Sequence, residues 1–271
     1  MCDVLGVSES GFYAWRKRPA SQRTREDAQL TQAIRQVFLT HQGRYGSPRI
    51  YRELKDQGRR TSRKRVARLM REAEICARRK QRRALTTRRD PSHPVAPNVL
   101  HRDFTATEPH KKWVTDITSI PTKQGWLYLA VILDLYSRIV VGWSMSGNCD
   151  EELVEHALDQ ALARRRPQAG LLHHSERGSQ YTSRAYQVCL ERSGMIVSMS
   201  RKGNCWDNAV MESFFGTLKD ECVGSTVYAS HDEARSELFT YMEGYYNRAR
   251  RHSTLGYVSP FVYEQMRNQE R

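Results

Sequence analysis

Two neighbouring stretches carry the clearest pattern in the chain: residues 171–181 read LLHHSERGSQY, and residues 201–215 read RKGNCWDNAVMESFF. The first is a short apolar run that ends in polar residues, which is typical of a buried strand followed by a loop. The second places turn-forming and capping residues before an apolar helical segment. Each stretch holds one acid, Glu176 directly after the strand and Glu212 near the start of the helix. The two stretches therefore predict an α/β layer with an acid at each junction.

Working outward from these stretches, strands and helices alternate across the second half of the chain. Three apolar runs with short connections favour an antiparallel meander. The expected strands cover 112–121, 126–134, 139–145, 170–174 and 195–200. The expected helices cover 150–165, 179–192, a segment capped by Asp207 or Asn208 that runs to Asp220, and 231–247.

A third acid, Asp116, lies in the first of these strands. Mg²⁺ prefers carboxylate oxygens, and two divalent cations about 4 Å apart can activate a water or a 3′-hydroxyl to cleave or join phosphodiesters. Taken singly, Asp116 could be a strand-end hydrogen-bonding residue, Glu176 a surface loop residue and Glu212 a solvated helix residue. Their order and context favour a common metal-dependent site. Asp134, which ends an apolar strand, is expected to fix the following turn instead.

The net charge of +14 is distributed unevenly along the 271 residues. Residues 1–112 hold 27 Lys and Arg against 11 Asp and Glu, whereas residues 113–271 hold 17 against 19. Lys and Arg that neutralise phosphates release counterions and so drive association with nucleic acids. The distribution predicts that residues 1–112 bind DNA and that residues 113–271 carry the catalytic site. A solvated basic surface without a partner is the alternative.

Helical periodicity predicts an all-α region of helix-turn-helix type over residues 1–76. Its expected helices cover 25–41, 49–57 with Ser47 as the cap, and 63–74 with Ser62 as the cap. On the last helix an apolar stripe is accompanied by a basic face of Lys64, Arg68 and Arg71, which predicts contact with DNA.

Residues 77–100 read as a basic, proline-containing linker that lies along phosphates. Its cations are Arg78, Arg79, Lys80, Arg82 and Arg83, followed by Arg88 and Arg89. We assign 101–225 to the catalytic core, and 226–271 to a C-terminal helix and a basic, aromatic tail that includes Arg250 and Arg251.

Six cysteines without CxxC pairs predict free thiols in a reducing compartment. No apolar run approaches the roughly 18 residues of a membrane span. We therefore expect a cytoplasmic protein without a membrane partner.

Several long phrases resemble the IS3-family insertion-sequence transposases, in their second reading frame. These phrases are WVTDIT at 113–118, DLYSRIVVGW at 134–143, HSERGSQY at 174–181, GNCWDNA at 203–209 and RRHSTLGY at 250–257. The resemblance covers nearly the whole chain.

The resemblance implies an RNase H-like integrase core, with a mixed five-stranded sheet flanked by helices and two Mg²⁺ ions, for which Mn²⁺ can substitute. A DDE-type triad would consist of Asp116, Glu176 and Glu212, with Lys219 as a basic companion holding DNA. The implied reaction is cleavage and strand transfer at terminal inverted repeats, into target DNA. The implied assembly is a homodimer or higher oligomer, fused to the product of an upstream frame, at the bacterial nucleoid.

One departure from the family pattern concerns position 176, where the family carries Asp and this chain carries Glu. The extra methylene displaces the carboxylate, and a displacement of about 1 Å in a reacting site can cost about 10²-fold in rate. Lowered activity, a DNA-binding relic and a plain RNase H-like nuclease are the alternatives. His174, Asn204 and Trp206 are auxiliary candidates, although a strand-end histidine is more often structural.

Overall fold

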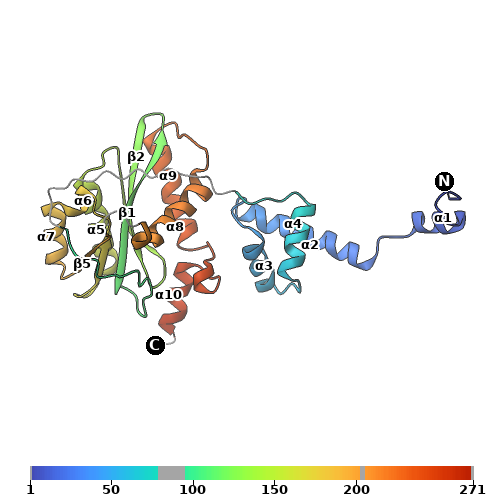
Figure 1. The fold of residues 1–271 in the computed structure, drawn as a ribbon, viewed down its shortest axis with the longest axis horizontal. Coiled ribbons are helices and arrows are strands. Elements are labelled where there is room, and N and C mark those ends of the chain that lie inside the picture. The colour runs from blue at the N-terminus through green and yellow to red at the C-terminus, as the bar shows by residue number, and fades with distance from the viewer. Residues whose placement is uncertain (1, 79–94, 202–204, 270–271) are drawn as a thin grey trace. The chain divides into compact units, whose positions relative to one another are not determined.

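The computed structural model describes residues 2–78, 95–201 and 205–269 of the chain (Figure 1). The chain divides into two compact units, Met1–Arg78 and Arg79–Arg271. Arg79, Lys80, Arg82 and Arg83 of the predicted linker, together with Asn204, lie outside the described residues.

The first unit is entirely helical within its described part, as the periodicity predicts. Its helices are α1 (Glu9–Lys17), α2 (Gln22–Thr40), α3 (Ser47–Asp56) and α4 (Arg63–Glu72). Helices α2, α3 and α4 bury an apolar core that includes Leu30, Ile34, Val37, Ile50, Leu54, Val66, Leu69 and Met70. Helix α1, in contrast, buries none of its residues.

Two helix starts in this unit test the capping predictions. The Ser62 side chain accepts a hydrogen bond from the Arg65 backbone N–H at 3.2 Å, so the predicted cap of α4 is confirmed. The prediction that Ser47 caps α3 is wrong. Gly46 occupies the N-cap position without a side-chain bond, and Ser47 with Pro48 forms the first turn. Because proline has no N–H to satisfy, the first turn tolerates it directly after an uncapped start.

The second unit contains a mixed five-stranded sheet in the order β3-β2-β1-β4-β5. The strands are β1 (Lys112–Thr122), β2 (Gly125–Asp134), β3 (Val140–Ser146), β4 (Leu172–Ser175) and β5 (Ile196–Met199). The first three form the predicted antiparallel meander, and β1, β4 and β5 pair in parallel.

Helices cover both faces of this sheet (Figure 1). One face packs against α5 (Glu151–Arg165), α6 (Ser179–Thr182) and α7 (Arg184–Arg192). The other packs against α8 (Ala209–Leu218), the π-helix η2 (Lys219–Val223), α9 (His231–Phe239) and the π-helix η3 (Thr240–Tyr246). A 3₁₀-helix η1 (Cys205–Asn208) precedes α8, and η4 (Ser253–Leu255) and α10 (Pro260–Gln269) end the described chain.

Strand β2 shows why the apolar run is almost continuous. Leu129, Val131 and Leu133 join the core on the α8 side, whereas Ala130 and Ile132 join the core on the α5 side. Side chains alternate between the two faces of a strand, so a strand covered on both faces is apolar at every position.

Two predicted helices differ from the observed ones. The helix expected over 179–192 is broken at Ser183, whose side chain accepts a hydrogen bond from the Tyr186 N–H and starts α7. The helix expected over 231–247 is α-helical only to Phe239 and then widens into η3. A serine that can cap competes with the backbone for N–H groups, which explains the first break.

The last residues of the predicted linker pack against the second unit. The Ser198 hydroxyl of β5 accepts hydrogen bonds from the Val99 and Leu100 N–H groups at 2.9 and 3.1 Å. Leu100 is buried in the core. Residues 95–100 therefore line the edge of the sheet.

The side-chain inventory agrees with two further expectations. Cys2, Cys76, Cys149, Cys189 and Cys222 are free thiols, and the Cys205 side chain lies outside the described residues. Among the described helices, none has the length and apolar character needed to cross a membrane.

Gly142 provides a test of the contact between β3 and α5. A methyl group at this position would overlap the Ala157 carbonyl oxygen and the Ala161 Cβ. We expect Gly142→Ala to lower the free energy of unfolding by about 1–3 kcal/mol, measured by urea denaturation. Gly244→Ala is the matched control, because nothing lies within 4 Å of a Cβ there. Equal stability of the two variants would contradict the close packing.

Candidate active site

The site begins with the parallel pairing of β1 and β4. Val114 pairs with His174, and β4 ends one residue later at Ser175. Asp116 lies two residues beyond Val114 on β1, and Glu176 follows directly after β4. Because neighbouring strands are about 4.8 Å apart, this pairing brings Asp116 near the point where β4 ends.

Helix α8 brings the third acid to the same region. Glu212 lies in its first turn and is exposed, whereas Met211, Phe214, Phe215 and Leu218 are buried in the core on that side of the sheet. The Asn208 side-chain amide donates to the Thr115 carbonyl oxygen at 3.2 Å, which ties the start of α8 to the residue before Asp116. Asn208 holds the N-cap position, but its side chain makes no capping bond.

Asp207 was the other expected cap, and the structure gives it a different role. Its buried carboxylate accepts hydrogen bonds from the Arg201 guanidinium, the Arg201 N–H, Arg102 and Asn98, all at 2.8–2.9 Å. These donors, Arg201 above all, lower the pKa of Asp207. The network fixes the turn that precedes α8, and sequence reasoning missed it because its donors lie up to 109 positions away.

The pKa values indicate that the three acids share one environment. Burial raises the pKa of Asp116 well above its usual range, and the charges of Glu176 and Glu212 raise it further. Burial and then the Glu212 charge raise the pKa of Glu176, and desolvation raises that of Glu212. Lys219, at the C-cap of α8, acts in the opposite direction on Asp116. The structure thus brings together the three predicted carboxylates and Lys219.

The donor chemistry of this group fits a hard divalent cation, because such cations prefer carboxylate oxygens and relieve the repulsion among them. Within residues 2–78, 95–201 and 205–269, however, no set of three His, Cys, Asp or Glu side chains is gathered closely enough to hold a metal ion. The acids are therefore electrostatic neighbours that do not form a closed ligand set.

Two of the auxiliary candidates, His174 and Trp206, differ in their burial. His174 is buried, and its ring nitrogens lie 2.8 Å from the Ser198 hydroxyl and 3.1 Å from that of Ser200. Both nitrogens are thereby engaged, and burial lowers the pKa of His174 to about 4. This geometry gives His174 a structural role between β4 and β5. Trp206, in contrast, is 67% exposed beside the site.

Arg250 was predicted to contact DNA, and the structure contradicts this. Its side chain is buried and donates to both Glu221 carboxylate oxygens at 2.7 and 2.8 Å. The Tyr241 hydroxyl also donates to Glu221. Arg251 donates to the Tyr257 carbonyl oxygen and stays partly exposed. Arg78, Lys64 and Arg71 are exposed, whereas Arg68 forms ion pairs with Asp27 and Glu72.

Three family models match the chain. Models described as an integrase core domain match residues 106–205 and 193–260, and one described as an HTH-like domain matches residues 24–83. The fold and these matches define an integrase-core protein with a helix-turn-helix-like region.

Relatives extend over nearly the full chain. The insertion element IS600 uncharacterized 31 kDa protein of Shigella sonnei is 44% identical and covers 99% of each chain. The transposase for insertion sequence element IS904 of Lactococcus lactis is 43% identical over 92% of this chain and 98% of its own. Transposase InsF for insertion sequence IS3A of Escherichia coli K12 is 41% identical over 97% and 92%. The chain belongs to the IS3 family of insertion-sequence transposases.

Similar solved structures come from retroviruses. A simian T-cell lymphotropic virus intasome in complex with PP2A regulatory subunit B56 gamma matches with a TM-score of 0.46 and 15% identity, over 81% of this chain and 70% of its own. The HTLV-2 integrase catalytic core domain in complex with magnesium matches with a TM-score of 0.45 and 16% identity, over 59% and 99%.

The raised pKa of Glu176 predicts how stability depends on pH. Because the folded state holds this proton more tightly than the unfolded state, stability is lost as pH rises through the usual range of Glu towards the raised pKa. Glu176→Gln should therefore stabilise the protein at neutral pH in metal-free buffer, and this gain should fade in acid. Urea denaturation at several pH values measures it, with Glu191→Gln on the exposed part of α7 as the control. A pH-independent effect would contradict the shared environment.

The buried pair of Arg250 and Glu221 predicts a stability effect without a DNA effect. Arg250→Met leaves a buried charge without its partner, which should lower the free energy of unfolding by about 3–5 kcal/mol. The salt dependence of DNA binding should stay unchanged for protein that remains folded at low temperature. A weaker salt dependence would restore Arg250 as a phosphate contact.

Proposed function

We propose that this transposase cleaves the ends of its insertion sequence and joins them to target DNA, with Asp116, Glu176 and Glu212 as the metal-binding triad. The observation that carries this proposal is the parallel pairing of β1 with β4, which brings Asp116 on β1 near Glu176 directly after β4, with the Glu212 charge raising the pKa of both. Full-length relatives called transposases support the reaction class.

The proposed cofactor is Mg²⁺, as two ions for which Mn²⁺ can substitute. When bound, such ions would supply activation of an attacking hydroxyl and stabilisation of the leaving oxygen. Asp116, Glu176 and Glu212 would hold the metal, and the charges of Glu176 and Glu212 both act on Asp116. Lys219 contributes positive charge next to Asp116, where a phosphate oxygen would lie.

The chemistry consists of two displacements at phosphorus. In cleavage, a water oxygen forms a new bond to phosphorus while the bond to the 3′-oxygen breaks and that oxygen takes up a proton. In strand transfer, the freed 3′-hydroxyl attacks a target phosphodiester in the same way. The protein's part is to hold the reacting oxygens in line and to keep charge balanced, which positioning and electrostatics accomplish.

The proposed partners are the terminal inverted repeats and target DNA, with the protein acting as a homodimer or larger assembly in the bacterial cytoplasm at the nucleoid. Two element ends must meet in one complex, which favours at least two copies of the chain. Fusion to an upstream-frame product remains part of the proposal.

Glu176 supports a second candidate, a DNA-binding relic with weakened catalysis. Its side chain is one methylene longer than the Asp of the family pattern. The two candidates make different predictions for the wild type: the first predicts joined products, and the second predicts DNA binding with little or no joining.

A strand-transfer assay with labelled element-end DNA and Mg²⁺ tests the proposal. We expect joined products from the wild type and up to about 10²-fold more from Glu176→Asp. Glu212→Gln should lose more than about 10²-fold, since even second-shell residues of metal sites are worth about 10–100-fold. Glu191→Gln is the matched control on the exposed surface of α7.

Each of the other outcomes would contradict the proposed function in a different way. Joining that survives Glu212→Gln would refute the triad. Cleavage without joining would indicate a nuclease, and binding without cleavage by both wild type and Glu176→Asp would indicate a relic.

A further inference from the structure

Helix α4 is the most cationic helix of the first unit. Its ten residues include five cations and one acid. The apolar side chains Val66, Leu69 and Met70 are buried against the rest of the unit. The cations therefore occupy the remaining surface of the helix, and their neighbours decide which of them can meet a partner.

Asp27 of α2 holds two of these cations. The Arg65 Nε donates to Asp27 Oδ1 at 2.7 Å, and the Arg68 guanidinium donates to Asp27 Oδ2 at 2.7 Å. Glu26 lies 3.5 Å from Arg65, and Glu72 lies 2.9 Å from Arg68. Three acids thus surround two arginines, so this side of α4 carries no excess positive charge.

The other side of α4 has a different composition. Arg63, Lys64 and Arg71 are exposed, and no acid of the described first unit lies within ion-pair range of them. Lys64 and Arg71 are seven residues apart and so lie on one face, with Ala67 and Arg68 between them. Of these three cations only Arg68 is paired with acids, so Lys64 and Arg71 are the ones that can approach a phosphate backbone.

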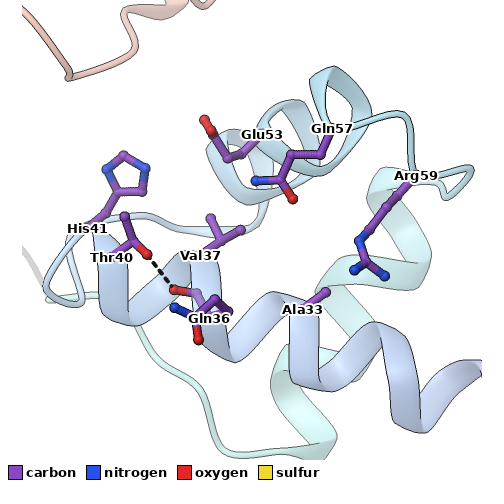
Figure 2. Close-up of a pocket in the computed structure, with 8 residues that line it drawn as sticks. All are labelled: Ala33, Gln36, Val37, Thr40, His41, Glu53, Gln57 and Arg59. Atoms are coloured by element: carbon purple, nitrogen blue, oxygen red, sulfur yellow. Dashed lines mark hydrogen bonds between the residues drawn. The ribbon is translucent and has the colours of Figure 1, made fainter.

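A nearby cation, Arg59, serves another surface. It lines a pocket between α2 and α3 together with Ala33, Gln57 and Glu53 (Figure 2). The same pocket includes Thr40, whose hydroxyl donates to the Gln36 carbonyl oxygen (Figure 2). Arg59 lies before α4 and lines this pocket, so it is not counted among the α4 cations.

We propose that α4 contacts duplex DNA through the face of Arg63, Lys64, Ala67 and Arg71, whereas Arg65 and Arg68 fasten the helix to α2 through Asp27. The second helix of a helix-turn-helix enters the major groove, and α4 follows α3 across a short turn. This inference rests on the proposed function in taking DNA as the partner. It also reassigns Arg68, which the periodicity alone places with Lys64 and Arg71.

Two double variants that remove the same formal charge test the assignment. Binding of the full chain to a mixed-sequence DNA duplex is measured from about 50 to 200 mM salt, and each phosphate contact contributes about 0.9 to the slope of log affinity against log salt. Lys64→Ala with Arg71→Ala should reduce the slope by about 1–2. Arg65→Ala with Arg68→Ala should change it by less than about 0.5 while lowering the melting temperature.

Asp27→Asn provides the converse test. The substitution keeps the shape of the side chain and removes the charge that Arg65 and Arg68 share, which leaves them only Glu26 and Glu72 as acidic partners, so the salt slope should become steeper and duplex affinity should rise. If Asp27 only stabilised the fold, Asp27→Asn would lower the stability of the protein and leave the salt slope of DNA binding unchanged.

An equal loss of slope in both double variants, or no loss in the Lys64 and Arg71 variant, would overturn the inference. No loss of slope in the Lys64 and Arg71 variant would overturn the inference even if the Arg65 and Arg68 variant failed to fold. Because the wild type's strand transfer is measured separately, failure of the α4 assignment and failure of the proposed reaction remain distinguishable.

Discussion

The parallel pairing of β1 with β4 is the interaction on which the candidate site depends. It joins strands from distant parts of the chain, and it brings Asp116 on β1 near the end of β4, after which Glu176 follows. A slip of one residue would turn every side chain of a strand to the opposite face. The apolar side chains of β1 and its neighbours prevent such a slip, because both faces of the sheet are covered by helices and each face needs its own set. Core packing thus determines where the acids lie.

The acidic side chains of the second unit fall into two groups. Glu221 is satisfied by Arg250 and Tyr241, and Asp207 is satisfied by Arg201, Arg102 and Asn98, so these groups stabilise the structure around the site. Asp116, Glu176 and Glu212 instead raise one another's pKa or lie in desolvated surroundings. Like charges that are held together by the fold and not neutralised by it are the expected signature of a functional site. The stable networks on both sides provide the rigidity that such an arrangement requires.

The cations of the first unit also fall into two groups, those paired with acids and those exposed. Its excess of Lys and Arg is visible in the composition, but the pairing of Arg65 and Arg68 with Asp27 separates helix-fastening cations from exposed ones. Net charge therefore measures attraction to DNA only approximately. Local pairing decides which side chains can release counterions from phosphates.

The sequence by itself determined the five strands, most of the helices and the family, because periodicity, capping residues and long motifs are local properties of the chain. It singled out the three acids that we propose as the triad. It also indicated that Asp134 fixes a turn, and its carboxylate does accept the Tyr136 and His110 N–H groups. Only the tertiary structure decided that Arg250 is buried, that Arg68 is paired, that Asn208 holds β1 and does not cap a helix, and that residues 95–100 belong to the sheet edge. The reason is that a polar side chain's role depends on its partner. In each of these cases the partner lies far away in sequence, where no periodicity reaches.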